Sequence, residues 1–172
     1  MKIAYKIIHF FILVICLILQ IVFIEYLKLY HISIDLVMIA ILGISIFDGV
    51  LYGITYGFAA GLLLDLMVSN IVGVNALIYA LDAFIVSKVI NMGFRFKIIT
   101  YVLIVFFITE LNLLVVSGVY YLFNFSTSLR QLGFEMLINP ICNILFMFLI
   151  FPALQAGWEK KDEFGFLYKD KI

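Results

Sequence analysis

Long apolar runs separated by short polar breaks dominate the chain. An apolar run of about 20 residues can cross the hydrocarbon core of a bilayer as a helix. The pattern predicts six such helices, at about 7–27, 32–47, 49–67, 72–90, 98–123 and 131–155. The second run is short for a crossing. We expect it to bury its ends against neighbouring helices or to thin the bilayer locally.

The breaks between the runs are too short to form a domain of their own. Gly, Asn and Ser, which are common turn residues, occur in them at 48–49, 69–70, 91–97 and 124–128. We therefore expect one six-helix transmembrane domain at 1–157 and a short cytoplasmic tail at 158–172. The first run is too long for the apolar part of a signal peptide, so we interpret it as an uncleaved helix.

Composition agrees with an all-α, polytopic transmembrane bundle. Hydrophobic residues make up 66% of the chain and charged residues 13%, whereas about a quarter of a soluble domain is charged. The net charge is zero, so nothing indicates nucleic-acid binding. Cys16 and Cys142 lie singly in apolar runs and lack metal-ligand spacing. We expect no metal and no cofactor.

The distribution of lysine and arginine predicts the topology, because cytoplasmic loops are enriched in both. With six helices and the N-terminus inside, nine positive charges lie on the cytoplasmic side and only Lys28 and Arg130 on the other. The cytoplasmic set is Lys2, Lys6, Lys88, Arg95, Lys97, Lys160, Lys161, Lys169 and Lys171. We therefore expect both termini in the cytoplasm.

The third run carries a glycine ladder that ends on an acid: Gly49, Gly53, Gly57, Gly61 and Asp65. Small residues at this spacing let membrane helices approach closely. Positions four apart differ by about 40° on a straight helix, so the ladder winds around it and suits different neighbours at different depths. Packing within the bundle and contact with another protein are both open, and we favour the first.

Acids in or beside the predicted helices are the second unusual feature. Asp35, Asp65 and Glu135 fall near outer helix ends, and Asp82 and Glu110 fall nearer mid-membrane. Intramembrane acids are costly and usually face the interior or a wet cavity. We expect Asp82 and Glu110 to be protonated or hydrogen-bonded. Helix–helix bonding, a proton or cation path, and a recognition surface at the outer face remain alternatives.

Known catalytic motifs do not appear in the sequence. It has no P-loop and no HExxH zinc motif, and its Ser and His residues form no plausible triad. We therefore do not expect an enzyme.

The order of several short motifs resembles the MreD family of rod shape-determining proteins. An acid, Asp35, opens the second helix, and a glycine-rich helix ends in a Gly-x-x-x-Asp pattern. The motif residues are Gly57, Gly61 and Asp65, then Gly73, Val74, Asn75, Ala76, Leu77 and Tyr79, and finally Glu135, Asn139, Pro140 and Pro152. A proline often seen before the acid of the second helix is missing, since Ser33 and Ile34 stand there.

This resemblance implies a non-catalytic scaffold of cell-wall elongation in the bacterial inner membrane. The implied partners are MreC and, through it, MreB, RodA and a class B penicillin-binding protein. It also implies a fold similar to the substrate-binding subunits of energy-coupling-factor vitamin transporters. Candidate packing or partner-binding residues are Gly49, Gly53, Gly57, Gly61, Asp65, Gly73 and Asn75, with Asp35 and Glu135 as a candidate outer-face polar cluster.

Two other functions remain open. A vitamin-binding transporter subunit would need an outer-face pocket with convergent polar groups. The bulky first helix argues against it, because Phe10, Phe11, Leu13, Ile15 and Leu17 replace the small residues by which such subunits dock. A proton-coupled transporter would use Asp82 and Glu110, but the discontinuous helices and paired repeats typical of transporters are not evident.

Overall fold

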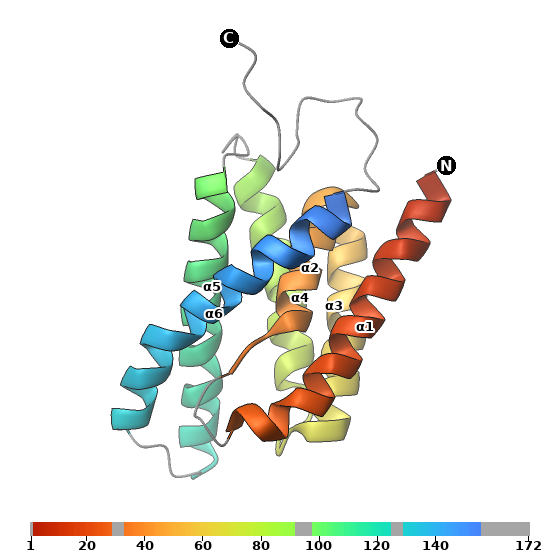
Figure 1. Ribbon diagram of the computed structural model, residues 1–172. Coiled ribbons are helices and arrows are strands. Elements are labelled where there is room, and N and C mark those ends of the chain that lie inside the picture. Colours follow the sequence, from red (N-terminus) through yellow and green to blue (C-terminus); the bar gives the residue numbers. More distant parts are fainter. Residues whose placement is uncertain (1, 29–32, 92–97, 125–128, 156–172) are drawn as a thin grey trace.

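The protein folds as six α-helices in the part of the chain that its computed structural model describes, residues 2–28, 33–91, 98–124 and 129–155. Side chains are described for 6–22, 33–91, 98–124 and 131–155. The helices are α1 (Lys2–Lys28), α2 (Leu36–Phe47), α3 (Val50–Val68), α4 (Val74–Asn91), α5 (Ile98–Leu122) and α6 (Leu129–Gln155) (Figure 1). The expected all-α fold is confirmed. The predicted tail and most of the breaks at 91–97 and 124–128 lie outside the described residues.

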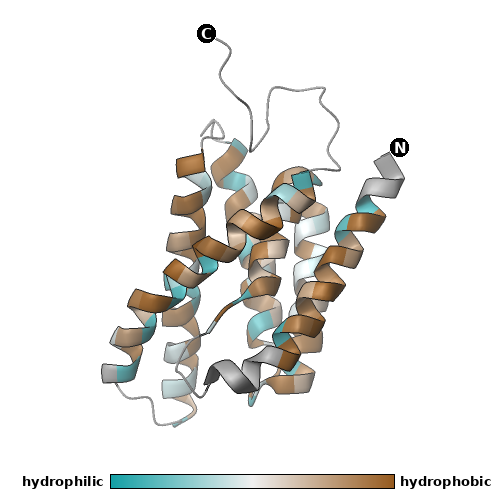
Figure 2. Cartoon of the chain, in the orientation of Figure 1, coloured by the Kyte–Doolittle hydropathy of each residue, from teal (hydrophilic) through white to brown (hydrophobic). Residues whose placement is uncertain are grey.

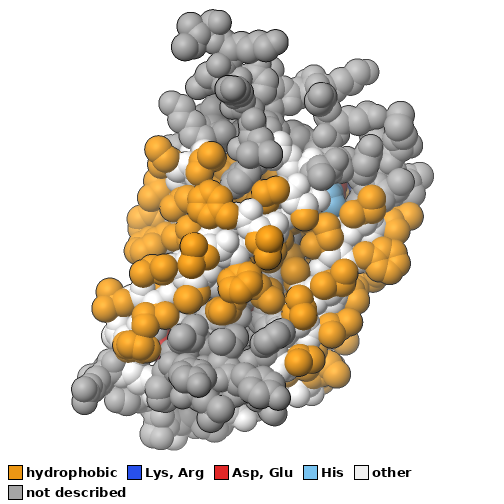
Figure 3. All heavy atoms as spheres, in the orientation of Figure 1, with side chains coloured by type: hydrophobic (Ala, Val, Ile, Leu, Met, Phe, Trp, Pro, Cys, Tyr) orange, Lys and Arg blue, Asp and Glu red, His pale blue; other side chains and the backbone are white. Residues whose placement is uncertain are grey.

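Four of these helices are long and apolar enough to cross a membrane: α3, α4, α5 and α6 from Gln131. Helices suit lipid because each satisfies its own backbone hydrogen bonds. Hydrophobic residues colour most of the ribbon (Figure 2), and hydrophobic side chains cover most of the described face in Figure 3. In α1, the described apolar stretch is Lys6–Val22.

Helix α2 corrects the prediction for the second run. It has 12 residues, so the helix alone, at about 18 Å, is shorter than a hydrocarbon core about 30 Å thick. It also begins at Leu36 rather than near residue 32, and residues 33–35 are not helical. Residues 37–45 are all buried, since α2 contacts α1, α3, α4 and α6. It is the central helix of the bundle.

The glycine ladder brings α3 against α2 and α4. A Cβ added at Gly61 would lie 2.6 Å from the Ala76 Cα atom, and one at Gly57 would lie 2.9 Å from the Tyr79 carbonyl oxygen. At Gly53 the nearest atom would be the Ser45 Cβ on α2, at 2.7 Å. The neighbour thus changes from α2 to α4 along the helix. Gly53, Gly57 and Gly61 are therefore packed against other helices of the same chain.

Two further glycines serve turns rather than contacts. Gly49, before α3, has φ of +100°, and Gly73, before α4, has φ of +101°. L-residues with a side chain rarely adopt this conformation. An added Cβ would have open space at both positions, so the backbone angle is what requires glycine there.

His9 joins three elements at the opposite end of the bundle from the α3–α4 turn. Its Nδ1 lies 2.6 Å from the Asp48 carboxylate and its Nε2 lies 2.7 Å from the Leu154 carbonyl oxygen. A carbonyl oxygen only accepts, so Nε2 carries a proton. The pair ties α1 to the end of α2 and the end of α6. Sequence analysis assigned His9 no role, because Asp48 is 39 residues away.

Candidate functional site

The candidate site is built around the start of α2, deep in the bundle. A helix start leaves backbone N–H groups without partners in the helix. Asp35 is the N-cap residue, and its Oδ1 accepts a hydrogen bond of 2.8 Å from the Met38 N–H. The acid predicted to open this helix therefore caps it. Since α2 is short, Asp35 lies within the bundle rather than at its outer face.

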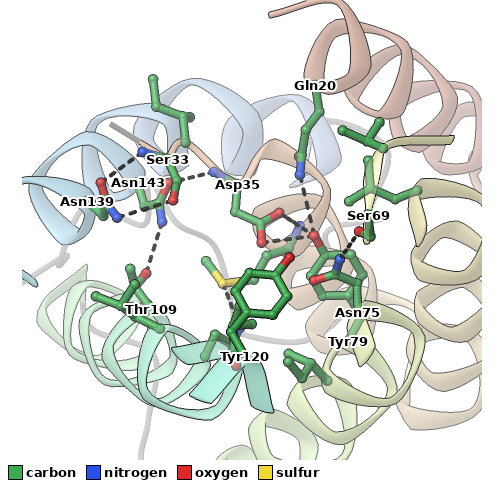
Figure 4. Close-up of a pocket in the computed structure, with 18 of the residues that line it drawn as sticks. Gln20, Ser33, Asp35, Ser69, Asn75, Tyr79, Thr109, Tyr120, Asn139 and Asn143 are labelled. Carbon is green, nitrogen blue, oxygen red and sulfur yellow. Dashed lines mark hydrogen bonds between the residues drawn. The ribbon is translucent and has the colours of Figure 1, made fainter. Parts of the chain in front are cut away.

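Amide side chains from α1 and α6 bind further backbone N–H groups here (Figure 4). Gln20 of α1 accepts from the Val37 N–H at 2.8 Å. On α6, Asn143 accepts from the Asp35 N–H and Asn139 from the Ser33 N–H, both at 2.9 Å. These bonds give partners to the backbone N–H groups at the start of α2, where the helix begins inside the bundle.

Tyr79 of α4 connects the Asp35 carboxylate to α1. Its hydroxyl donates to both Asp35 oxygens at 2.9 Å, and the Gln20 amide donates to the same hydroxyl at 3.4 Å. Asn143 also donates to the Thr109 hydroxyl of α5 at 3.1 Å. The network thereby spans α1, α2, α4, α5 and α6.

These groups border a cavity of about 250 Å³, which we call the polar cavity. It reaches the surface at the α3–α4 turn, where the exposed Asn70 lines it. The other lining residues are Gln20, Ser33, Ile34, Asp35, Met38, Leu64, Val68, Ser69, Asn75, Ile78, Tyr79, Thr109, Asn112, Leu113, Val116, Tyr120, Asn139 and Asn143. The lining is thus a mixture of amides, hydroxyls and apolar side chains with one acid.

The two mid-membrane acids have different surroundings. Asp82 is buried on α4, and its Oδ2 accepts a bond of 2.8 Å from Asn112 on α5. Glu110 lies on the outward side of α5, about 200° around the helix from Asn112. Its Oε1 is buried without a hydrogen-bond partner among the described residues. Among the described residues, Asp82 and Glu110 make no hydrogen bond to each other.

Asp65 closes the α3–α4 turn. Its carboxylate accepts from the Gly73 N–H at 2.9 Å, the Ala76 N–H at 3.2 Å and the Asn75 amide at 2.7 Å. An acid on α3 therefore caps the start of α4. Asn75 also donates to Ser69 at 3.1 Å. Asp65 does not line the cavity, although its partner Asn75 does.

The structure separates the predicted outer-face cluster. Asp35 lines the polar cavity, whereas Glu135 is outside its lining and accepts a bond of 3.0 Å from Gln131 on the exposed side of α6. Among the described residues, no group of three or more His, Cys, Asp or Glu could hold a metal ion. The cavity is therefore an amide-rich site rather than an acid cluster.

The cavity amides Gln20, Asn112 and Asn143 were not predicted from the sequence. Each interrupts an otherwise apolar helix, and such residues hydrogen-bond across membrane helices. Asn139 and Asn143 are four apart, which puts them on one face of α6. This spacing was a usable signal, but it does not reveal that their partners lie before α2, more than 100 residues earlier.

The model of the family described as rod shape-determining protein MreD matches residues 1–156 of the chain. No curated protein matches the chain, and no solved structure does. The similarity to vitamin-transporter subunits that the resemblance implies therefore stays a prediction.

Proposed function

The chain belongs to the MreD family of rod shape-determining proteins, and on that premise we propose that it is a non-catalytic scaffold of the bacterial cell-wall elongation machinery. In this proposal it lies in the inner membrane with both termini in the cytoplasm. It binds MreC and, through it, MreB, RodA and a class B penicillin-binding protein. The observation that carries the proposal is the family match over nearly the whole bundle.

Gly53, Gly57 and Gly61 of the glycine ladder already pack against α2 and α4. We therefore expect the partner surface on another part of the bundle. Gly57 and Gly61 meet backbone atoms of α4, so the substitutions that would block a partner there would first disrupt α4. We therefore propose that MreC's helix docks on the outward side of α5. That side presents Phe107, Leu111 and Leu114, which are 65%, 46% and 52% exposed.

Glu110 supports this choice of surface. It lies at the middle of α5, and an intramembrane acid normally pairs with another group. Its Oε1 is buried and has no partner within the described residues. A docked helix with a hydrogen-bond donor at mid-depth would complete this pairing once the side chains that cover Oε1 move aside, and a single-span partner such as MreC can present such a donor.

Two matched double variants test the surface. Phe107→Ala with Leu114→Ala truncates the α5 side, and Phe11→Ala with Ile18→Ala truncates exposed residues at the same spacing on α1. Tagged proteins are purified from membranes and the retained MreC is measured. We expect the α5 variant to lose most of it and the α1 variant to keep it.

The possible outcomes separate the surface from the function. Equal retention by both variants would reject the α5 surface alone. If wild type retains no MreC, and cells depleted of the protein stay rod-shaped, the scaffold proposal is wrong. The vitamin-binding alternative is not favoured by the family match, and α1 presents bulky Phe11 and Ile15 on its outward side.

A further inference from the structure

Most polar groups of the polar cavity already have partners. The oxygens of Gln20, Asn139 and Asn143 accept backbone N–H groups at the start of α2, and the amide nitrogens of Asn139 and Asn143 donate to Ser33 and Thr109. These bonds are needed for α2 to begin inside the bundle. The presence of amides alone therefore does not indicate a ligand.

Asn112 is the exception. It lines the cavity and is 9% exposed. Its nitrogen donates to the Asp82 carboxylate at 2.8 Å and to the Met38 sulfur at 3.3 Å. Its oxygen has no partner among the described residues, and neither does the second Asp82 oxygen. Buried acceptors without donors are rare and call for an explanation. What the site lacks is hydrogen-bond donors.

The charges around the polar cavity limit the kind of molecule that could supply these hydrogen-bond donors. Asp35 lines the cavity and Asp82 lies behind Asn112, whereas no Lys, Arg or His is among the described lining residues. An anion would meet like charge without compensation in a low-dielectric setting. A cation would pair with Asp35 and donate to Asn112. The tyrosine rings of Tyr79 and Tyr120, which also line the cavity, suit a cation as well.

The volume of the cavity further limits the kind of molecule that could bind. A cavity of about 250 Å³ corresponds to about eight water molecules at roughly 30 Å³ each. Drug-sized ligands occupy pockets of about 300–1,000 Å³. The occupant is therefore compact, with few non-hydrogen atoms beyond its charged group.

We propose that the polar cavity binds a small organic cation whose ammonium or guanidinium group pairs with Asp35 and donates a hydrogen bond to Asn112 Oδ1. The ligand enters at the α3–α4 turn, where Asn70 marks the opening. This site is distinct from the outward side of α5, so the proposal holds whether or not MreC docks there.

Matched small molecules test the charge requirement. The full chain in nanodiscs of zwitterionic lipid is titrated calorimetrically with methylguanidinium and with methylurea, its neutral counterpart of similar shape. We expect saturable binding of methylguanidinium at least tenfold tighter than that of methylurea. Equal binding of both, or no saturable binding of the cation, would overturn the proposal.

Two variants locate the binding in the cavity. Asp35→Asn removes the charge but keeps a residue that caps helices well, so α2 should still form. Val116→Phe fills the cavity without touching its hydrogen bonds. We expect each to weaken methylguanidinium binding at least tenfold. Glu135→Gln, which removes an acid outside the cavity, should leave binding unchanged. Full binding by folded Asp35→Asn and Val116→Phe would also overturn the proposal.

Discussion

Along α3 and α4, backbone lies against backbone, whereas around the start of α2 the same bundle encloses a cavity of about 250 Å³. We call the first region the glycine contact, defined by Gly57, Gly61 and the facing residues 75–79. It has no room for a methyl group. The polar cavity has room for several water molecules and holds an acceptor without a donor on Asn112.

The two regions differ in how well they tolerate substitution. In the glycine contact, a side chain added at Gly57 or Gly61 must move a helix. In the polar cavity, water or a ligand can replace a lost hydrogen bond at modest cost. Asp35 and Asp65 illustrate this contrast, because both cap helix starts, but only Asp35 lines the cavity. The comparison predicts a graded series of mutational effects.

The largest effect should come from the glycine contact. We expect Gly61→Leu to lower the free energy of unfolding by about 3 kcal/mol or more, because overpacking against backbone cannot be relieved by a rotamer change. Gly118→Leu on α5 is the control, since nothing lies within 4 Å of its added Cβ. Unfolding of the purified protein in mixed micelles, followed by helical circular dichroism, measures both. Equal stability of the two variants would contradict the glycine contact.

The next effect should come from Asp65. Asp65→Ala leaves the Gly73 and Ala76 N–H groups without an acceptor, and we expect a loss of about 2 kcal/mol because two hydrogen bonds are lost and the Ala76 N–H is buried. Glu135→Ala removes an acid that bonds only with the exposed Gln131 and should change stability by less than about 0.5 kcal/mol. The same unfolding measurement applies. A larger loss for Glu135→Ala would refute the capping role of Asp65.

The glycine contact could be predicted from sequence and the polar cavity could not. Glycines at spacing four encode a helix contact locally, and hydrophobic runs encode the six helices. Gly61 contacts Asn75 and Ala76 on the next helix, across the short α3–α4 connection. Such short-range relations are visible in a single sequence.

The polar cavity depends on long-range pairs. Asn143 and Asp35 are 108 residues apart, and Asn112 and Asp82 are 30 apart. The presence of intramembrane acids indicates that hydrogen bonds to them are needed. It does not indicate which residues donate those hydrogen bonds. The start of α2 was misplaced because residues 32–36 include apolar side chains that hydropathy assigns to a helix. Asp35, a good N-cap residue, was the better local signal.

A smaller effect is expected within the polar cavity. Asn143→Ala removes the acceptor of the Asp35 N–H, and we expect a loss of about 1 kcal/mol, less than for Asp65→Ala, because cavity water can bind the freed group. Hydrogen exchange of the amides at 35–38 should rise while the rest of α2 stays protected. A loss as large as that of Asp65→Ala would mean that the cavity does not admit water.

The smallest effect should come from Glu110, which belongs to neither region. It is an acid at mid-membrane like Asp82, but its Oε1 makes no hydrogen bond to the described residues. We expect Glu110→Gln to change the free energy of unfolding by less than about 0.5 kcal/mol, since no intramolecular bond is lost.

The same variant should nonetheless reduce the MreC that co-purifies, because its outward carboxyl group is proposed to pair with the partner's helix. Asp82→Asn is the matched control: it changes the other mid-membrane acid, which is buried against Asn112, and should leave MreC retention unchanged. If Glu110→Gln destabilises the isolated protein more than Asp82→Asn does, Glu110 has a partner inside the bundle. If the Glu110→Gln variant retains MreC as well as wild type does, Glu110 is not part of the docking surface. The pairing of Glu110 with a donor on the partner's helix would then be wrong.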